Sequence, residues 1–144
     1  MQLDNLYQEV ILDHYKRPEH KGLSSSFDVQ VHHINPSCGD DVTLNLSNKD
    51  GVLEITWEGV GCAISMASAS IMAGLLSGKR IDENQPVVDR FVTLMQSKGT
   101  DLGDEEILED AVAFAGVSQF PARIKCALLA WMAYKDASIQ ISKK

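Results

Sequence analysis

The sequence changes its periodicity within residues 53–63, LEITWEGVGCA, and this change decides the fold. Leu53, Ile55 and Trp57 alternate with polar residues, which is the pattern of a half-buried β-strand. The stretch rich in Ala, Ser and Met that starts at Ala63 is typical of a helix lying close to a neighbour. The glycines of the GVG segment between them permit a tight turn. The segment therefore predicts a strand that leads directly into a helix, with Cys62 at the junction.

Two earlier segments alternate in the same way as residues 53–57. The residues expected on the buried face of these segments are Phe27, Val29, Val31 and His33 in the first, and Val42, Leu44 and Leu46 in the second. The tetrapeptide at 48–51, Asn-Lys-Asp-Gly, is a hairpin signal between the last two runs. Together the three runs predict an antiparallel meander with one buried face.

The other predicted elements are helices. The first precedes the strands, has apolar residues at helical spacing and ends at Arg17-Pro18; the spaced residues are Leu3, Leu6, Val10, Ile11 and Tyr15. The later helices are expected over 63–76, over about 86–96, from a cap at Asp104 to Gly116, and from Pro121 past Tyr134. The order indicates an α+β fold in which a three-stranded antiparallel sheet packs against helices, with a helical C-terminal half and one domain over 1–144.

Composition excludes several classes of protein. The chain has 144 residues, 44% of them hydrophobic, and a net charge of −7 without a basic patch, so we expect no nucleic-acid partner. No signal peptide and no stretch long enough to span a membrane are visible. Three cysteines, an odd number without a secretory signal, argue for the reducing cytoplasm rather than for disulfides.

Three isolated cysteines and one aspartate form a possible ligand set for a soft-leaning cation such as Zn²⁺. Cys38 and Asp40 lie in NPSCGD, Cys62 in GVGCA, and Cys126 in PARIKC. The cysteines are 24 and 64 residues apart, so only the folded chain can bring them together.

Each of these residues also has a purely structural interpretation. Cys38 could be a small buried hydrophobe, but its turn-forming and acidic neighbours weaken that interpretation. It is instead expected on an exposed loop between two strands, where a thiol can handle a group in transit. Cys62 opens a helix, whose N-terminus favours the thiolate, but a core cysteine is a serious competitor. For Cys126, position alone favours core packing, although Arg123 and Lys125 would lower its pKa if they lie near it. For Asp40, a solvated turn carboxylate is the simplest interpretation.

The histidines are weaker candidates for ligands. His32 and His33 point to opposite strand faces, so at most one could approach a metal. His14 and His20 are expected on a helix surface and in a loop.

The cysteine segments in this order resemble the U-type iron–sulfur assembly proteins, the family of IscU, SufU and the amino-terminal NifU domain. The resemblance rests on Asn-Pro-x-Cys-Gly-Asp and Gly-x-Gly-Cys-Ala-Ile-Ser, and it runs from the first helix to the Cys126 helix. The IscU branch has histidine before its third cysteine, whereas this chain has Lys125. The segment between the last two cysteines is also longer in this chain than in the IscU branch. These differences resemble the SufU branch, and the resemblance implies that Cys38, Asp40, Cys62 and Cys126 hold zinc.

The resemblance implies a zinc-dependent sulfur acceptor for a SufS-like cysteine desulfurase, feeding the iron–sulfur assembly machinery. Cys38 would leave the metal and attack the donor's persulfide, while the other three residues retain the metal and Arg123 and Lys125 serve as auxiliary cations. A scaffold for a [2Fe–2S] cluster or iron is the alternative, and a structural zinc domain is the third. A cysteine hydrolase is disfavoured, because no histidine is clearly placed as its base. Whether the protein is an enzyme or a carrier stays open.

Overall fold

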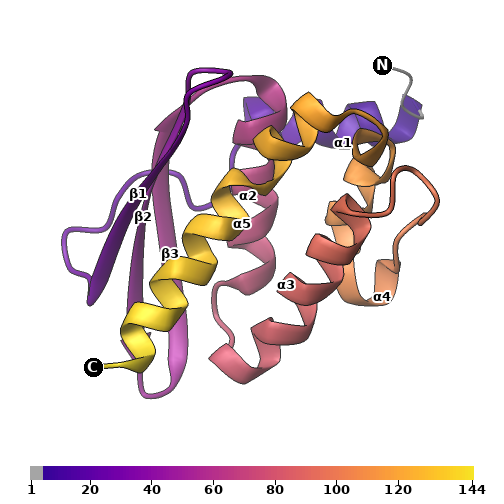
Figure 1. The fold of residues 1–144 in the computed structure, drawn as a ribbon. Helices are drawn as coiled ribbons and strands as arrows, with labels where there is room; N and C mark the ends of the chain where they lie inside the picture. The colour runs from indigo at the N-terminus through magenta and orange to yellow at the C-terminus, as the bar shows by residue number, and fades with distance from the viewer. Residues whose placement is uncertain (1–4) are drawn as a thin grey trace.

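The computed structural model describes residues 5–144 of the chain, with the side chains from residue 7 onward. Its elements follow one another in the predicted order, with a helix first, then a sheet, then helices (Figure 1). They are α1 (Asn5–Lys16), β1 (Val29–Asn35), β2 (Asp40–Lys49), β3 (Val52–Val60), α2 (Ala63–Leu76), α3 (Ile81–Met95), α4 (Glu105–Leu108), the 3₁₀ helix η1 (Glu109–Gln119) and α5 (Pro121–Ser142). The predicted α+β class is confirmed.

The sheet has the strand order β1-β2-β3, and both pairings are antiparallel. Asp50 and Gly51 form the tight turn between β2 and β3 with φ of 55° and 89°. Positive φ at both central residues is the conformation that suits the twist of a hairpin, and Gly51 adopts it without strain. The main-chain N–H of Gly51 also donates to Asn48 Oδ1 at 2.8 Å, so the predicted hairpin is confirmed.

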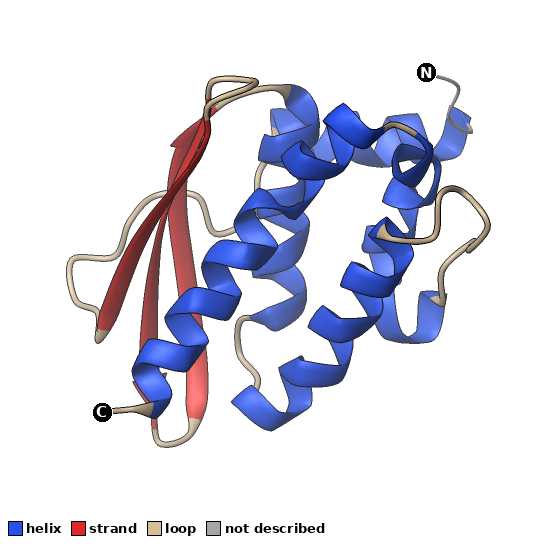
Figure 2. Ribbon diagram, viewed as in Figure 1, coloured by secondary structure: helices blue, strands red, loops and turns tan. Residues whose placement is uncertain are grey.

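All the helices lie on one side of the sheet (Figure 2). The strand residues predicted to face inward are fully buried on β2 and β3, among them Leu44, Ile55 and Trp57. The helices α2 and α5 pack directly on this face, and α3 contacts α5 on the side away from it. Trp131 of α5 stacks on Phe91 of α3 with ring centroids 4.1 Å apart. The sheet and α5 are therefore held in one continuous apolar core.

Two predictions at the start of the chain differ from the structure or fall outside it. Phe27 precedes β1 and is 44% exposed, so its placement on the buried face of the strand was wrong. The main-chain N–H of Asp28 donates to Leu46 O before the strand begins at Val29. Leu3 lies outside the described residues, and α1 ends at Lys16 as expected before Pro18.

The predicted start of the third helix, at Pro86, was wrong, because α3 begins five residues earlier at Ile81. Glu83 Oε1 accepts a hydrogen bond from the main-chain N–H of Arg80, which stabilises the earlier start. Pro86 falls in the second turn, where its missing N–H costs one main-chain hydrogen bond.

The helix expected to run from Asp104 to Gly116 is divided in the structure. Asp104 caps it as predicted, accepting from the N–H of Glu106 at 3.0 Å. Glu109 adopts φ of 47°, so α4 ends after one turn and the tighter η1 follows. Gly116 does not adopt positive φ and does not end the helix, which continues to Gln119.

No helix among residues 5–144 is both long and apolar enough to cross a membrane.

Candidate metal centre

Cys38 lies in the exposed turn between β1 and β2, as the sequence predicted. Gly39 has φ of 69°, a conformation that glycine adopts at little cost and that returns the chain toward β2. The main-chain N–H of Cys38 donates to Asn35 O at 3.2 Å across this turn. The turn is therefore held by a main-chain hydrogen bond and exposes the Cys38 thiol to solvent.

Cys126 approaches Cys38 from helix α5. It lies in the second turn of α5, is fully buried, and its Sγ is 3.4 Å from Cys38 Sγ although the two residues are 88 apart in sequence. Burial raises the pKa of the Cys126 thiol, and hydrogen bonds with Cys38 and Asp40 raise it further. The core position expected for Cys126 and its proximity to a second thiol are therefore both present.

Asp40 is the first residue of β2 and is only 1% exposed. The interpretation as a solvated turn carboxylate was therefore wrong. Its Oδ1 accepts the main-chain N–H of Cys62 at 3.0 Å, and Oδ2 lies 4.0 Å from Cys62 Sγ. Within residues 5–144 no cationic side chain pairs with this carboxylate, although a buried charge is usually paired or bound to metal.

Cys62 is the N-cap of α2, as its place at the strand–helix junction predicted. Its half-buried thiol accepts the main-chain N–H of Ser65 at 3.5 Å. The approach to Asp40 requires glycine at the preceding position, since a Cβ on Gly61 would lie 2.4 Å from Asp40 Oδ1. The local sequence thus brings Cys62 against the carboxylate.

Three of the four predicted ligands form one compact group. Cys38, Asp40 and Cys126 each offer an atom within 4.8 Å of the others, whereas Cys62 Sγ lies 4.0 Å from Asp40 but not within 4.8 Å of all three. We call Cys38, Asp40 and Cys126 the thiol–carboxylate group. Two thiols and a buried carboxylate without a cationic partner are a chemically suitable donor set for a metal ion such as zinc.

The two cations near Cys126 in sequence do not lower its pKa. Arg123 and Lys125 are both exposed, and within the described part of the chain neither forms an ion pair. The effect of burial dominates at Cys126, so its pKa lies above the ordinary value.

Two histidines diverge as the strand period predicted. His32 lies 2.8 Å from Asp41 and His33 lies 2.8 Å from Asp136, so neither side chain enters the thiol–carboxylate group. The prediction for His14 was wrong, because its side chain is buried rather than on the helix surface.

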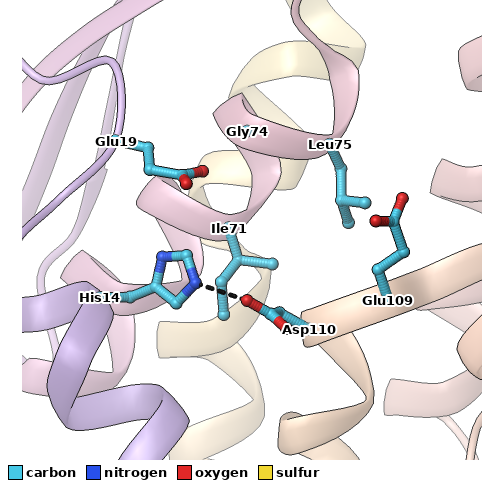
Figure 3. Close-up of a pocket in the computed structure, with 7 residues that line it drawn as sticks. All are labelled: His14, Glu19, Ile71, Gly74, Leu75, Glu109 and Asp110. Carbon is cyan, nitrogen blue, oxygen red and sulfur yellow. Dashed lines mark hydrogen bonds and ion pairs between the residues drawn. The ribbon is translucent and has the colours of Figure 1, made fainter.

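His14 contacts two residues that are distant in sequence. Its Nδ1 lies 2.8 Å from Ser70 Oγ and its Nε2 lies 2.9 Å from Asp110 Oδ2. The adjoining pocket has a volume of about 190 Å³. Figure 3 shows its lining residues, among them Glu19 from the loop after α1 and Glu109 from η1. We call His14, Ser70 and Asp110 the histidine cluster.

Asn35 and Ser65 are contacts of the cysteines that sequence reasoning missed. Asn35 Nδ2 lies 3.8 Å from Cys126 Sγ, and Ser65 Oγ donates to the carbonyl of Cys62 at 3.0 Å. Their positions within the two cysteine motifs were the available signal.

Comparison with known proteins gives matches over nearly the whole chain. The model of the NifU-like N terminal domain matches residues 6–127. The zinc-dependent sulfurtransferase SufU of Bacillus subtilis is 47% identical over 91% of this chain and 88% of its own length. The iron–sulfur cluster assembly scaffold protein IscU of Streptococcus pyogenes is 39% identical over 94% of this chain and 84% of its own length. The crystal structure of a NifU-like protein (N-terminal) from Brucella abortus superimposes with a TM-score of 0.86 at 29% identity, covering 98% of this chain and 97% of that one.

Proposed function

The chain belongs to the family of NifU-like N-terminal domains, and from this membership we propose that it is a zinc-dependent sulfur acceptor in iron–sulfur cluster assembly. The observation that carries the proposal is the pairing of an exposed thiol, Cys38, with a buried thiol and a buried carboxylate. The 47% identity to the zinc-dependent sulfurtransferase SufU supports zinc as the metal.

We propose Cys38, Asp40, Cys62 and Cys126 as the residues that hold the metal. Zinc, when bound there, would keep the thiols as thiolates and shield their charge. Asp40 already has one oxygen fixed by the N–H of Cys62, which leaves the other oxygen directed toward the thiols. Cys62 lies next to Asp40, so a small movement of its side chain brings it into the set.

The reaction proposed for Cys38 is attack on a persulfide of a cysteine desulfurase. The Cys38 thiolate attacks the terminal sulfur of the donor's persulfide and forms a new S–S bond, while the bond between that sulfur and the donor cysteine breaks. The electron pair leaves with the donor's thiolate, so Cys38 carries the persulfide and no external oxidant or reductant is needed. The exposure of Cys38 makes it the thiol that a macromolecular donor can reach.

Arg123 and Lys125 are proposed as auxiliary residues for this step. Both are exposed at the start of α5, near Cys126, and neither is engaged in an ion pair within residues 5–144. A persulfide is anionic at neutral pH, and unpaired cations favour the approach of an anion. We also propose that the chain acts as one domain in the cytoplasm and passes its sulfur to the downstream assembly machinery.

The test is to mix the purified zinc-loaded protein with a cysteine desulfurase and cysteine and to locate the added sulfur by peptide mass mapping. The expected result is one added sulfur on Cys38. Full sulfur transfer in Cys38→Ala would contradict the role of Cys38, and unchanged transfer after removal of zinc would contradict the role of the metal.

A scaffold for a [2Fe–2S] cluster is the second candidate function. It is favoured by the 39% identity to the IscU scaffold protein of Streptococcus pyogenes, and the same thiols and carboxylate suit iron. Metal analysis of the protein purified without oxygen separates the two, because a cluster gives brown protein containing iron and sulfide whereas zinc gives colourless protein.

A further inference from the structure

Asn35, the last residue of β1, lies against all three members of the thiol–carboxylate group. It is paired with Asp40 in the β1–β2 register, directly across the strands. Its main-chain carbonyl accepts the N–H of Cys38 at 3.2 Å. Its side-chain Nδ2 donates to Cys126 Sγ at 3.8 Å. A single residue thus connects the exposed thiol, the buried thiol and the carboxylate.

The amide of Asn35 is buried and therefore needs a hydrogen-bond acceptor inside the protein, which is the sulfur of Cys126. Asn35 is only 7% exposed, and a buried amide N–H that lacks an acceptor costs about 1–3 kcal/mol. Within residues 5–144 the acceptor of its Nδ2 is Cys126 Sγ. The buried Asn45 on β2 behaves differently, because its Nδ2 donates to the main-chain carbonyl of Ser24 at 3.0 Å. The amide of Asn45 therefore holds a loop against the sheet, whereas the amide of Asn35 donates to a cysteine sulfur.

The sulfurs of Cys38 and Cys126 lie 3.4 Å apart but differ in the hydrogen bonds that they accept. Cys126 is buried and accepts the amide N–H of Asn35. Cys38 is exposed, and in the described part of the chain no N–H group donates to its sulfur. A hydrogen bond to a thiolate stabilises its negative charge and makes it a weaker nucleophile. Cys126, which accepts such a bond, is therefore the sulfur that stays on the metal, and Cys38, which accepts none from an N–H group, is the one that reacts.

We propose that Asn35 is a positioning residue that makes Cys126 the anchoring thiol and Cys38 the reactive one. Its amide holds the Cys126 thiolate, and its carbonyl holds the turn that presents Cys38. The inference rests on the proposed function in that Cys38 is taken as the sulfur acceptor.

The first experiment measures zinc release from zinc-loaded Asn35→Leu, in which the side chain keeps its approximate size but loses its donor. Loss of a hydrogen bond to a metal ligand lowers metal affinity by about 10–100-fold. We therefore expect a chelator to remove zinc about tenfold faster than from the wild type. Asn35→Asp, which replaces the N–H donor by an acceptor, is the second variant and keeps the test valid if Asn35→Leu does not fold.

The second experiment locates added sulfur after treatment with inorganic polysulfide, so that no desulfurase is needed. A cysteine thiolate takes one sulfur atom from the polysulfide dianion, and a dianion one sulfur shorter leaves. We expect the persulfide on Cys38 in the wild type and a measurable share on Cys126 in both Asn35 variants.

Asn45→Leu is the matched control, since it removes another buried amide from the same sheet. We expect it to lower stability without changing the rate of zinc release or the position of the persulfide. If Asn35 had only a structural role, its variants would likewise lose stability without a change in zinc release or in the position of the persulfide. Wild-type zinc release and persulfide on Cys38 alone in both Asn35 variants would therefore overturn the proposal, as would equal changes in Asn45→Leu.

The proposed function can fail separately. If polysulfide labels the variants as expected but a desulfurase transfers no sulfur to the wild type, the positioning role of Asn35 is supported and the sulfur-acceptor function is contradicted.

Discussion

The histidine cluster and the thiol–carboxylate group both assemble polar side chains from distant segments, but only the first is complete by itself. Both ring nitrogens of His14 have a partner, Ser70 on one side and Asp110 on the other. In the thiol–carboxylate group the two sulfurs face each other and the carboxylate of Asp40 has no cationic partner within residues 5–144. The histidine cluster joins α1, α2 and η1 through its own hydrogen bonds, whereas the second group has the donor atoms to hold a cation.

The comparison shows that burial and proximity of polar groups do not by themselves indicate a functional site. The histidine cluster adjoins a pocket, yet its hydrogen-bonding capacity is used inside the protein (Figure 3). The thiol–carboxylate group differs because, within residues 5–144, its buried carboxylate has no cationic partner and one of its thiols is exposed. Substitutions in the histidine cluster should therefore change stability, whereas substitutions in the thiol–carboxylate group should change metal binding or sulfur transfer.

The largest effect is expected from Cys38→Ser. The hydroxyl is a far weaker nucleophile than the thiolate, so we expect persulfide formation to fall by a factor on the order of 100 or more. Because residue 38 is exposed, the free energy of unfolding of the metal-free protein should change by less than about 0.5 kcal/mol. Mass mapping and urea unfolding measure the two quantities.

A control for this variant moves the thiol by one residue. The double change Ser37→Cys with Cys38→Ser keeps an exposed thiol on the same turn. Transfer at the wild-type rate in this variant would show that exposure, rather than position beside Cys126, decides the reaction.

Asp40→Asn is expected to lower zinc affinity by about 10–100-fold, as judged by competition with a chelator. The amide oxygen can still accept the N–H of Cys62, so the main effect is loss of the charge that faces the thiols. Asp41→Asn is the matched control, because Asp41 is an exposed carboxylate bonded to His32. An equal loss of affinity in both variants would mean that general negative charge, rather than a ligand, attracts the metal.

His14→Ala is expected to lower the free energy of unfolding by about 2 kcal/mol without changing zinc affinity. It removes two hydrogen bonds and leaves Ser70 buried with one partner fewer. Denaturant unfolding of metal-free protein measures the loss, and the exposed His32→Ala serves as control with a change below about 0.5 kcal/mol. A marked loss of zinc affinity in His14→Ala would contradict the separation of the two regions.

The smallest effect is expected at Asp101, whose carboxylate is bonded to both terminal nitrogens of Arg90. Hydrogen bonds from Arg90 and from the N–H of Gly103 lower the pKa of Asp101 from 3.8 to about 2. The carboxylate therefore stabilises the fold above about pH 4, and this contribution is lost as the pH falls toward 2. We expect Asp101→Asn to cost roughly 1 kcal/mol at pH 7 and progressively less as the pH falls through 2, measured by unfolding at pH 7 and across the acid range. An undiminished difference at low pH would contradict this assignment.

The sheet could be predicted from the sequence because its signals are local. Alternation in 53–57 and the turn at Asp50-Gly51 depend on neighbouring residues only. The positions of Cys38 in a turn and Cys62 at a helix start were predictable for the same reason.

Features that depend on distant partners could not be predicted. His14 is buried because Ser70 and Asp110 approach it from 56 and 96 residues away. The contact of Asn35 with Cys126 likewise exists only after α5 has packed on the sheet. The early start of α3 was missed because Arg80 is an unusual residue at a helix N-terminus, while Pro86 gives a stronger local signal.

Cys38 and Cys126 lie 88 positions apart in sequence, so a metal bound by both would also affect the folding of the chain. A cation held by both sulfurs would join the turn after β1 to α5 and close a loop that includes β2, β3, α2, α3, α4 and η1. Such a cross-link removes extended conformations from the unfolded chain, and closing a long loop is entropically costly without it. A cation bound by both sulfurs would therefore act as a removable cross-link, and its release would make this part of the chain easier to unfold.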